Sequence, residues 1–444
     1  MPRNAAPPIK ASATPAKSAA KASGSRARAN STAGLRGPAP RKAAASSASA
    51  RGLNLLTSPL GAYYLLVGSV ALLALIGLVM SLSSSSVRSI TAGLSPYAQL
   101  VAQLRHIGMG AALMALMVFT PIKWIKRLAG PVFVVACALQ VLTFIPAFSL
   151  SAGGNNSWIY LPVVGVMQPA EAGKLALVVW LGAVLGKRHG ELGYWRAASV
   201  PALGTAAMIL LVLGGDDLGT ALVFFLMVLC AFVIAGTPMK LIGVAGGAAV
   251  TAVAYFLIFS QDGSNRLNRI LATFDPNCDT AGICYQALHG RYALATGGLF
   301  GVGLGSSRQK WNYLPEAHND FVFAIIGEEL GLLGTLLVLG LFVCVGLAMA
   351  RVITTSNDPF VRVATAGVGG WILGQAFINI GVVIGLLPVI GLPLPFVSAG
   401  GSALLTTMGA MGLVINFARH APGVGVERAN RALLARQSLT VVAR

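Results

Sequence analysis

The chain has 444 residues, of which 56% are apolar and only 10% are charged, and its mean hydropathy is +0.76. Soluble domains are about half apolar and about a quarter charged. These values exclude a soluble protein and indicate that lipid covers much of the surface. The formal net charge of +19 is unevenly spread, because residues 1–52 hold ten Lys or Arg and no acid, and the first acidic residue is Glu171.

The basic segment 1–55 is rich in Ala, Ser, Pro and Lys, a composition that cannot bury enough apolar surface to fold. It is therefore predicted to be a disordered cytoplasmic tail. It lacks the pattern of a signal peptide, because no apolar stretch of roughly 7–15 residues follows a short charged start. Attraction to anionic lipid headgroups is favoured over nucleic-acid binding as the role of these charges, so no nucleic-acid partner is expected.

Ten segments have the length and composition of membrane-spanning helices, which need about 20 mostly apolar residues. Strands of a membrane barrel would alternate apolar and polar residues, a pattern that these segments lack. The predicted fold class is an all-α polytopic membrane protein with ten transmembrane helices. The segments are residues 62–82, 102–120, 131–149, 169–186, 199–213, 218–236, 240–259, 321–350, 363–386 and 396–418.

The distribution of Lys and Arg predicts that both termini are cytoplasmic, because cytoplasmic loops carry an excess of these residues. Cations follow the second, fourth, sixth, eighth and tenth segments, whereas the loops at 150–168 and 387–395 hold none. This orientation places the long loop at 260–320 on the outer face. The predicted organisation is a ten-helix membrane domain over 56–420, followed by a second basic cytoplasmic tail over 421–444.

Glu171 and Lys174 stand at the outer end of the fourth segment, just after Pro169. A spacing of three puts both side chains on one helix face, where they can neutralise each other near the membrane boundary. Two hypotheses stay open. In the first, the pair is a structural ion pair that makes insertion of the helix into the membrane tolerable. In the second, Lys174 contacts a substrate pyrophosphate and Glu171 holds it in place.

Three features of the outer side have structural and functional alternatives. Asp216 and Asp217 precede the sixth segment, where a plain N-cap is favoured over a cation site. The glycines at 297–305 have no following G-K-[ST] and no preceding strand, so a flexible turn is predicted instead of a nucleotide site. The cations of the 260–320 loop are candidates for gripping an anionic headgroup, with simple solvation as the alternative.

Asp320 begins the strongly apolar eighth segment. It is either the N-cap of that helix or a general base at the membrane–water boundary, with a pKa tuned by partial burial. Glu328 and Glu329 lie two turns further in, about 12 Å deeper. Carboxylates at that depth need partners or a polar cavity. Prolines and glycines over 388–401 forbid a continuous helix and predict either the wall of a cavity or a re-entrant turn.

Six motifs, in order over about residues 60–420, resemble those of the FtsW/RodA/SpoVE (SEDS) family of peptidoglycan glycosyltransferases. The chain departs from the family pattern where Gly215 and Asp216 replace a Gln-Pro pair, and where Ala399 replaces the Tyr of S-Y-G-G-S. The long N-terminal tail and the sequence of the fifth motif, at 314–331, favour the division (FtsW) branch over the elongation (RodA) branch. The motifs are QPAEAGK at 168–174, DLGT at 217–220, YQ at 285–286, GGLFGVGLG at 297–305, LPEAHNDFVFAIIGEELG at 314–331 and GLPLPFVSAGGS at 391–402.

The resemblance implies a polymerase of lipid II, a disaccharide-pentapeptide on undecaprenyl pyrophosphate, acting on the outer face of the cytoplasmic membrane during cell division. Asp320 would deprotonate the acceptor GlcNAc 4-hydroxyl, whose oxygen would attack the donor MurNAc C1 with inversion and expel undecaprenyl pyrophosphate. The candidate cofactor is a divalent cation, Mg²⁺ or Mn²⁺, and the implied partners are a class B penicillin-binding protein and other division proteins at the septum. The implied substrate-binding residues are Lys174, Glu171, Arg266, Arg269, Gln286, Lys310, Glu316, His318 and Ser398.

Other functions remain as alternatives to this polymerase. They are a lipid II flippase, a RodA-like elongation polymerase and a non-catalytic scaffold, for which Asp320 should be dispensable. A transporter should keep polar residues along a full path across the membrane, whereas the ionisable residues here gather on the outer side.

Cys278 and Cys284 are the two cysteines outside the apolar segments. The predicted orientation places both outside the membrane, where disulfides persist. A disulfide that stiffens the outer loop is predicted, with two free thiols as the alternative.

Overall fold

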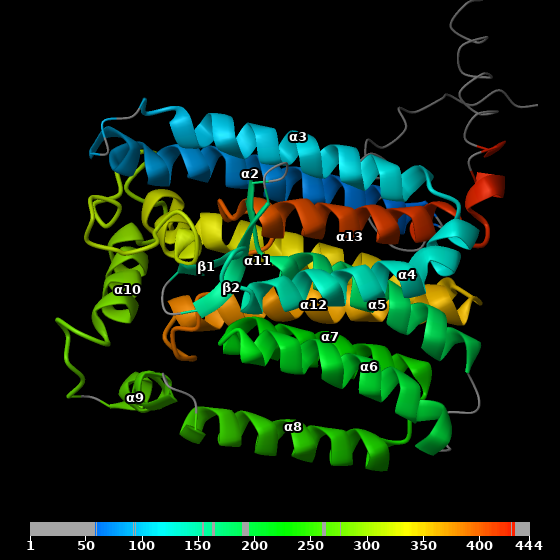
Figure 1. Cartoon of the computed structure of the whole chain (residues 1–444). Helices are drawn as coiled ribbons and strands as arrows, with labels where there is room; N and C mark the ends of the chain where they lie inside the picture. The colour runs from blue at the N-terminus through cyan, green and yellow to red at the C-terminus, as the bar shows by residue number, and fades with distance from the viewer. Residues whose placement is uncertain are drawn as a thin grey trace, which may run out of the picture. The chain divides into compact units, whose positions relative to one another are not determined.

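A computed structural model of the chain describes residues 58–430, apart from 59, 92, 94, 153–154, 162–164, 189–194, 260–262, 276 and 428. The predicted tail 1–55 lies outside the described residues, as does 431–444 of the predicted C-terminal tail. The described chain is mostly helical (Figure 1). Its elements are α2 Gly61–Thr91, α3 Ala98–Phe119, α4 Ile122–Val141, η1 Leu142–Phe144, β1 Ser149–Ala152, β2 Asn155–Leu161, β3 Gly165–Met167, α5 Pro169–Lys187, α6 Trp195–Gly214, α7 Leu218–Ala235, α8 Met239–Phe259, α9 Gly263–Phe274, α10 Tyr285–Gly297, α11 Val322–Thr355, α12 Pro359–Val383 and α13 Gly401–Arg419.

Eight of the described helices are long and apolar enough to cross a membrane, namely α2, α3, α4, α5, α7, α11, α12 and α13. Two more, α6 and α8, contain shorter apolar stretches at Ala198–Gly214 and Met239–Tyr255. Large apolar side chains such as Leu116 and Phe119 of α3 are 60% and 71% exposed, as expected for a surface covered by lipid. The chain is a polytopic helical membrane protein, as predicted, and the count of ten crossings stays a prediction.

The third of the described helices, α4, begins nine residues before its predicted start at 131. The cations that predicted a loop lie inside its first turns. Lys126 pairs with Asp358 before α12 at 2.6 Å between Nζ and Oδ2, and Arg127 lies over the Trp124 ring. Partners from another helix and from the same turn therefore allow charged residues to enter the helix.

Two other helices also depart from their predicted bounds. α2 runs to Thr91, beyond its predicted end at 82. The hydroxyls of Ser84 and Ser85 donate to carbonyl oxygens four residues earlier, so these polar residues satisfy themselves within the helix. α13 begins at Gly401 instead of 396, because Phe396 has a positive φ of 66° that no helix accommodates.

The loops that are predicted to lie outside the membrane contain structure that was not predicted. Residues 149–167 form a three-stranded antiparallel sheet in the order β1-β2-β3, with Ile159 paired to Ser149 on one side and Met167 on the other. The loop at 260–320 contains α9 and α10, which lie at the same end of the bundle in Figure 1. A small sheet and two short helices thus add to the predicted all-α fold.

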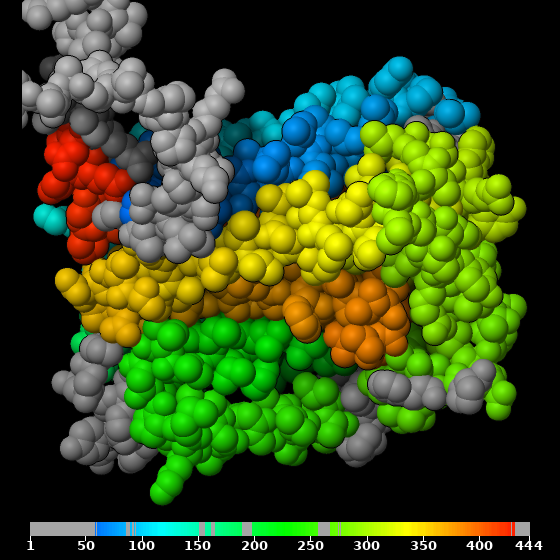
Figure 2. Space-filling model, turned by 180° about the vertical axis from the view of Figure 1, so that it is seen from behind, coloured from blue at the N-terminus to red at the C-terminus, as the bar shows by residue number. Residues whose placement is uncertain are grey.

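The centre of the bundle is formed by α5, α12 and α13. Their central windows are 67%, 72% and 83% buried, against 11% for α3. α13 packs on α3, α12 packs on α5 and α7, and α11 packs on α2; Figure 2 shows α11 in yellow beside α2 in blue. Polar side chains on the inner faces of α5 and α12 are therefore enclosed by protein instead of lipid.

The two ends of the described membrane domain meet. The backbone N–H of Leu60, just before α2, donates to Oε2 of Glu427, after α13, at 2.9 Å. Both ends therefore lie on the same side of the bundle. That this side is cytoplasmic stays a prediction from the distribution of Lys and Arg.

The long helix α11 is interrupted at Gly331, which has φ 70° and ψ −163°. Residues 297–305, the glycine-rich loop, pack against this break. A Cβ on Gly297 would overlap the carbonyl oxygen of Gly327, so only glycine permits this close approach. The predicted flexible turn is instead a loop bonded to the helix. Four backbone hydrogen bonds join them, from Val302 to Glu328, from Gly303 to Glu329, from Leu332 to Gly298 and from Leu333 to Leu299.

Candidate functional site

Asp320 precedes α11 and does not cap it. The N-cap residue is Phe321, which makes no side-chain cap hydrogen bond, so the alternative of Asp320 as N-cap is wrong. Oδ1 of Asp320 is buried and has no hydrogen-bond partner among the described residues. A Cβ built on Gly391 would lie 3.5 Å from Oδ2. The carboxylate thus faces the irregular segment after α12 without being used by the fold.

The surroundings of Asp320 favour its protonated form. Burial, and after it the carboxylate of Glu316, raises the pKa of the Asp320 carboxyl to about 7. A general base works best when its pKa lies near the operating pH, because it is then both deprotonated and basic enough to accept a proton. The carboxylate therefore has the properties of a general base.

This pKa gives a prediction for the pH dependence of catalysis. Only deprotonated Asp320 accepts a proton, so we expect kcat/KM for glycan synthesis to rise with pH through a midpoint near 7 and then to level off. Initial rates across about pH 5–9 measure this profile. A profile without a midpoint above about pH 5 would indicate an ordinary aspartate, since the usual pKa is about 3.9.

The backbone around Asp320 is fixed by side chains from two other segments. Nδ2 of Asn379, on α12, donates to the carbonyl oxygens of both Asp320 and Leu392 at 2.7 Å. Oγ of Ser398 donates to the carbonyl oxygen of Asn319 at 2.6 Å. The predicted substrate residue Ser398 is buried, and its hydroxyl locks the segment after α12 onto the residue before Asp320.

Glu171 and Lys174 form an ion pair of 2.7 Å in the core, where they are 2% and 0% exposed. The ammonium group also donates to Oε1 of Gln375 at 3.1 Å and lies 5.0 Å from the centre of the Trp371 ring. Gln375 in turn donates to the carbonyl oxygen of Pro393 at 2.8 Å. The pair is thus connected to the segment that faces Asp320, and Lys174 is enclosed by protein.

Gln375 and Asn379 of α12 were missed by the sequence analysis. They stand four apart, so they share one face of the helix, and they connect the ion pair and Asp320 to the same segment. Two amides on one face of an apolar spanning helix are a signal of function or of a buried network. That signal was present in the sequence.

Several polar atoms near residues 398–401 are buried without a hydrogen-bond partner in the described part of the chain. Gln103 of α3 donates to the carbonyl oxygen of Ser398 at 3.5 Å, and the ring of His106 lies against Gly401. Such atoms in an otherwise satisfied interior need an explanation, for which a ligand or water is the usual one. The atoms are Oε1 of Gln103, Nδ1 of His106 and Oδ1 of Asn319, Asp320 and Asn379.

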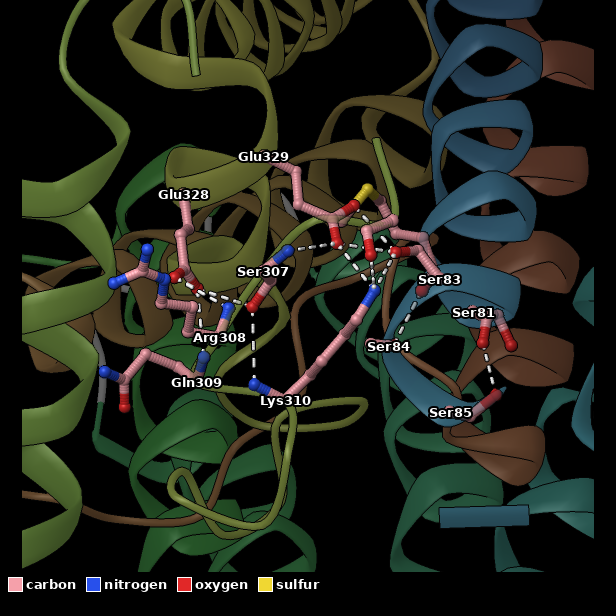
Figure 3. Close-up of polar contacts among 12 residues, drawn as sticks. Ser81, Ser83, Ser84, Ser85, Ser307, Arg308, Gln309, Lys310, Glu328 and Glu329 are labelled. Atoms are coloured by element: carbon pink, nitrogen blue, oxygen red, sulfur yellow. Dashed lines mark hydrogen bonds and ion pairs between the residues drawn. The ribbon is translucent and has the colours of Figure 1, made fainter. Parts of the chain in front are cut away.

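Lys310 belongs to a different cluster, between the glycine-rich loop and α2. Figure 3 shows it extending toward Glu329 of α11 and Ser83 of α2. Its Nζ lies 3.1 Å from Oε1 of Glu329, and the hydroxyl of Ser83 lies 2.7 Å from both carboxylate oxygens of that residue. The predicted contact of Lys310 with substrate stays a prediction, and the buried side chain is already engaged by the fold.

Glu328 is satisfied by a turn of the same loop (Figure 3). Its carboxylate accepts the hydroxyl of Ser307 and the backbone N–H groups of Arg308, at 3.0 Å, and Gln309, at 3.4 Å. The expectation that Glu328 and Glu329 have partners at this depth is confirmed. The two acids hold the loop that leads to Asp320.

Three further predicted residues lie close to Asp320 in the chain or contact the segment that leads to it. His318 and Glu316 approach to 3.9 Å between Nε2 and Oε2, and Nε2 of Gln286, on α10, donates to the carbonyl oxygen of Pro315 at 3.2 Å. Their contact with substrate stays a prediction. The two remaining predicted cations are on α9, where Arg269 is exposed and the side chain of Arg266 lies outside the described part.

The favoured N-cap between the fifth and sixth spans is confirmed. Asp217 caps α7, because its Oδ1 accepts the backbone N–H of Thr220 at 2.9 Å. Its Oδ2 accepts a hydrogen bond from Nε2 of Gln168 at 2.7 Å. This carboxylate therefore has a structural role and joins the starts of α5 and α7.

The described residues contain no group of three or more His, Cys, Asp or Glu side chains arranged to hold a metal ion. The described side chains therefore do not fit a resident Mg²⁺ or Mn²⁺ by themselves, and we derive no step through a metal.

Cys278 and Cys284 are joined by a disulfide just before α10, with their Cα atoms 6.1 Å apart. We expect alkylation of the denatured protein without reductant, followed by mass spectrometry, to label three of the five cysteines. The internal controls are Cys137, Cys230 and Cys344, which are free thiols. Labelling of all five cysteines would rule out the disulfide. The disulfide should contribute about 2–3 kcal/mol to the free energy of unfolding by restricting the unfolded loop.

Comparison with known proteins agrees with this architecture. The profile of the FtsW/RodA/SpoVE family, described as a cell cycle protein, matches residues 63–422. The chain is 36% identical over 378 residues to the probable peptidoglycan glycosyltransferase FtsW of Mycobacterium tuberculosis, covering 85% of this chain and 71% of that protein. It is 33% identical over 370 residues to the protein of the same name in Bacillus subtilis, covering 80% of this chain and 89% of that protein.

Two solved structures have the same fold. One is a chain from a study of the structural coordination of polymerization and crosslinking by a peptidoglycan synthase complex, with a TM-score of 0.64 and 26% identity over 80% of this chain and 96% of that one. The other is the rod shape determining protein RodA of Thermus thermophilus, with a TM-score of 0.59 and 25% identity over 81% of this chain and 97% of that one.

The fold and the site thus define a helical membrane protein with a half-buried aspartate just before a broken spanning helix, whose carboxylate has a buried oxygen without a partner among the described residues. Within that class, the chain belongs to the FtsW/RodA/SpoVE family.

Proposed function

We propose that this chain polymerises lipid II into glycan strands on the outer face of the cytoplasmic membrane during cell division. It is a peptidoglycan glycosyltransferase, the activity that gives its relatives their names. The observation that carries the proposal is the Asp320 carboxylate, which belongs to a half-buried residue, has a buried oxygen without a partner among the described residues and has a pKa of about 7.

In the proposed reaction, Asp320 accepts the proton of the acceptor sugar's 4-hydroxyl. The acceptor oxygen forms a bond to C1 of the donor sugar while the bond from C1 to the pyrophosphate oxygen breaks. Undecaprenyl pyrophosphate leaves with that electron pair, and a single displacement inverts C1. The proton on Asp320 is then released to water, which restores the base.

The residues around Asp320 are proposed to set its position. Asn379 holds its backbone, and Ser398 holds that of Asn319, so the backbone that carries the carboxylate cannot shift without breaking hydrogen bonds from two segments. A base misplaced by about 1 Å can lose about 100-fold in rate. Glu316 and His318, just before Asp320 in the chain, are proposed to contact the sugars.

The proposed partner is a class B penicillin-binding protein, which would cross-link the new strand. The likeness to a chain of a solved peptidoglycan synthase complex supports this pairing. The proposed arrangement is ten crossings with both termini cytoplasmic, a membrane domain over 56–420 with basic tails on either side, and location at the division septum. The meeting of Leu60 and Glu427 supports the shared side of the two ends.

The test is an assay of the purified chain with labelled lipid II, alone and with its transpeptidase partner. We expect long glycan strands. Transfer of lipid II across vesicle membranes without any glycan, under both conditions, would favour the flippase. A fluorescent fusion separates the two polymerase branches, because a division enzyme gathers at the septum and an elongation enzyme along the lateral wall.

A further inference from the structure

A cavity of about 330 Å³ lies beside α9 and α10, away from the ion pair on α5. The Cys278–Cys284 disulfide forms part of its wall. Apolar side chains, including Leu288 of α10 and Leu387 and Val389 of the segment after α12, form another part. Figure 2 shows that segment, in orange, next to the light-green stretch that contains α10. The cavity is therefore built from three separate parts of the chain.

Two arginines line the same cavity, Arg269 from α9 and Arg291 from α10. Neither guanidinium forms an ion pair within the described chain. Asp275 also lines the cavity, and its Oδ1 already accepts the backbone N–H of Asn277 at 2.9 Å. A planar guanidinium presents paired donors that match a carboxylate or a phosphate. The cavity thus combines an apolar part with two uncommitted cations.

The cavity lies close to Asp320. Val389, in its lining, is two residues before Gly391, which faces the Asp320 carboxylate. Two residues of extended chain span about 7 Å. On the other side, Gly290 of α10 lies against the ring of Phe321, the residue after Asp320. A substrate with its reacting sugar at Asp320 therefore has a second group within reach of the cavity.

We infer that this cavity binds the peptide arm of the lipid-linked substrate, with Arg291 and Arg269 holding its carboxylates and the apolar part receiving its small side chains. The inference rests on the proposed function. A volume of about 330 Å³ is at the lower end of the range for ligand sites, about 300–1,000 Å³, and suits a few small residues. A pyrophosphate group would engage the arginines but not the apolar part of the lining, and the undecaprenyl chain joined to it is too large for a cavity of about 330 Å³.

Binding of soluble probes to the full chain in detergent tests the inference without catalysis. The probes are the pentapeptide L-Ala-γ-D-Glu-L-Lys-D-Ala-D-Ala and inorganic pyrophosphate, titrated by calorimetry. We expect the peptide to bind, Arg291→Ala to weaken it by about tenfold, and Arg291→Lys to weaken it less, because a charge remains but the paired donors are lost. Peptide binding should also fall with salt, since the arginines are exposed.

The matched control is Arg308→Ala. Arg308 is also an exposed arginine of the outer loop, but it does not line the cavity, and its backbone instead of its side chain holds Glu328. We expect this variant to bind the peptide like the unmodified chain. Equal loss in both variants would indicate unspecific attraction to positive charge and would overturn the inference, as would pyrophosphate displacing the peptide at lower concentration.

A kinetic comparison then places the peptide at this cavity during synthesis. We expect Arg291→Ala to raise KM for lipid II with the full pentapeptide about tenfold, and to leave KM unchanged for lipid II trimmed to one amino acid. An equal rise for both substrates would assign Arg291 to the sugars or the pyrophosphate. If the chain binds the peptide through Arg291 but makes no glycan, the proposed function fails and the cavity assignment stands.

Discussion

The Asp320→Asn variant is expected to lose about 10²–10⁴-fold in the rate of glycan synthesis, the usual contribution of a general base. Asparagine keeps the size of the side chain but cannot accept the proton. The fold should survive, because the carboxylate caps no helix and its Oδ1 has no partner among the described residues. Initial rates with labelled lipid II, together with the yield of folded protein in detergent, measure both effects.

The control for this change is Asp279→Asn in the exposed loop between the two cysteines. Oδ1 of Asp279 accepts the backbone N–H of Ala281 at 3.0 Å, a bond that asparagine can also accept. We expect full synthesis from this variant. Near-normal synthesis by Asp320→Asn would rule out Asp320 as the base and would favour a scaffold or transporter.

Lys174→Met is expected to destabilise the protein by about 3–5 kcal/mol, the cost of removing one partner from a buried ion pair. Glu171 would then lose its ion-pair partner while only 2% exposed, and the hydroxyl of Thr406 at 3.2 Å would stay as a side-chain partner. Thermal unfolding in detergent measures the loss. Replacing both residues, with Glu171→Gln and Lys174→Met, should restore most of the stability, because no unpaired charge is left.

The same double variant separates the two hypotheses for the pair. Synthesis at a normal rate by the stable double variant would make the pair structural, which agrees with the complete burial of Lys174. A stable but inactive double variant would require a substrate contact by Lys174 and a movement that exposes it. A single variant as stable as the unmodified chain would contradict the buried ion pair itself.

The spanning helices could be predicted because lipid imposes a local requirement, a long apolar stretch, on each of them. The bounds of α4 and α2 were wrong because polar residues are satisfied by a partner that is remote in sequence or lies within the same helix, and the start of α13 was wrong because Phe396 has a positive φ. Lys126 enters α4 because Asp358, 232 residues away, pairs with it. The helix α9 could have been found, since Leu267, Ile270 and Leu271 repeat at helical spacing.

The chemistry of the candidate site was predictable, but its connections were not. Asp320 stands out in the sequence as an acid at the start of an apolar helix, and the structure leaves its carboxylate unused by the fold. That Lys174 contacts Gln375, 201 residues away, and that Ser83 contacts Glu329, 246 residues away, depends on helix packing. No local pattern encodes which faces of two distant helices meet.

The four hydrogen bonds across the break at Gly331 constrain how the protein can move. Separating the glycine-rich loop from α11 would leave backbone N–H and C=O groups without hydrogen-bond partners at membrane depth. Each unpaired group there costs several kcal/mol of free energy. The loop and both halves of α11 should therefore travel as one rigid body. Asp320 lies between the two and is carried with them. A hinge motion that admits a lipid chain must then occur outside this unit. The bundle can open to the lipid while the Asp320 carboxylate keeps its position relative to α11 and the loop.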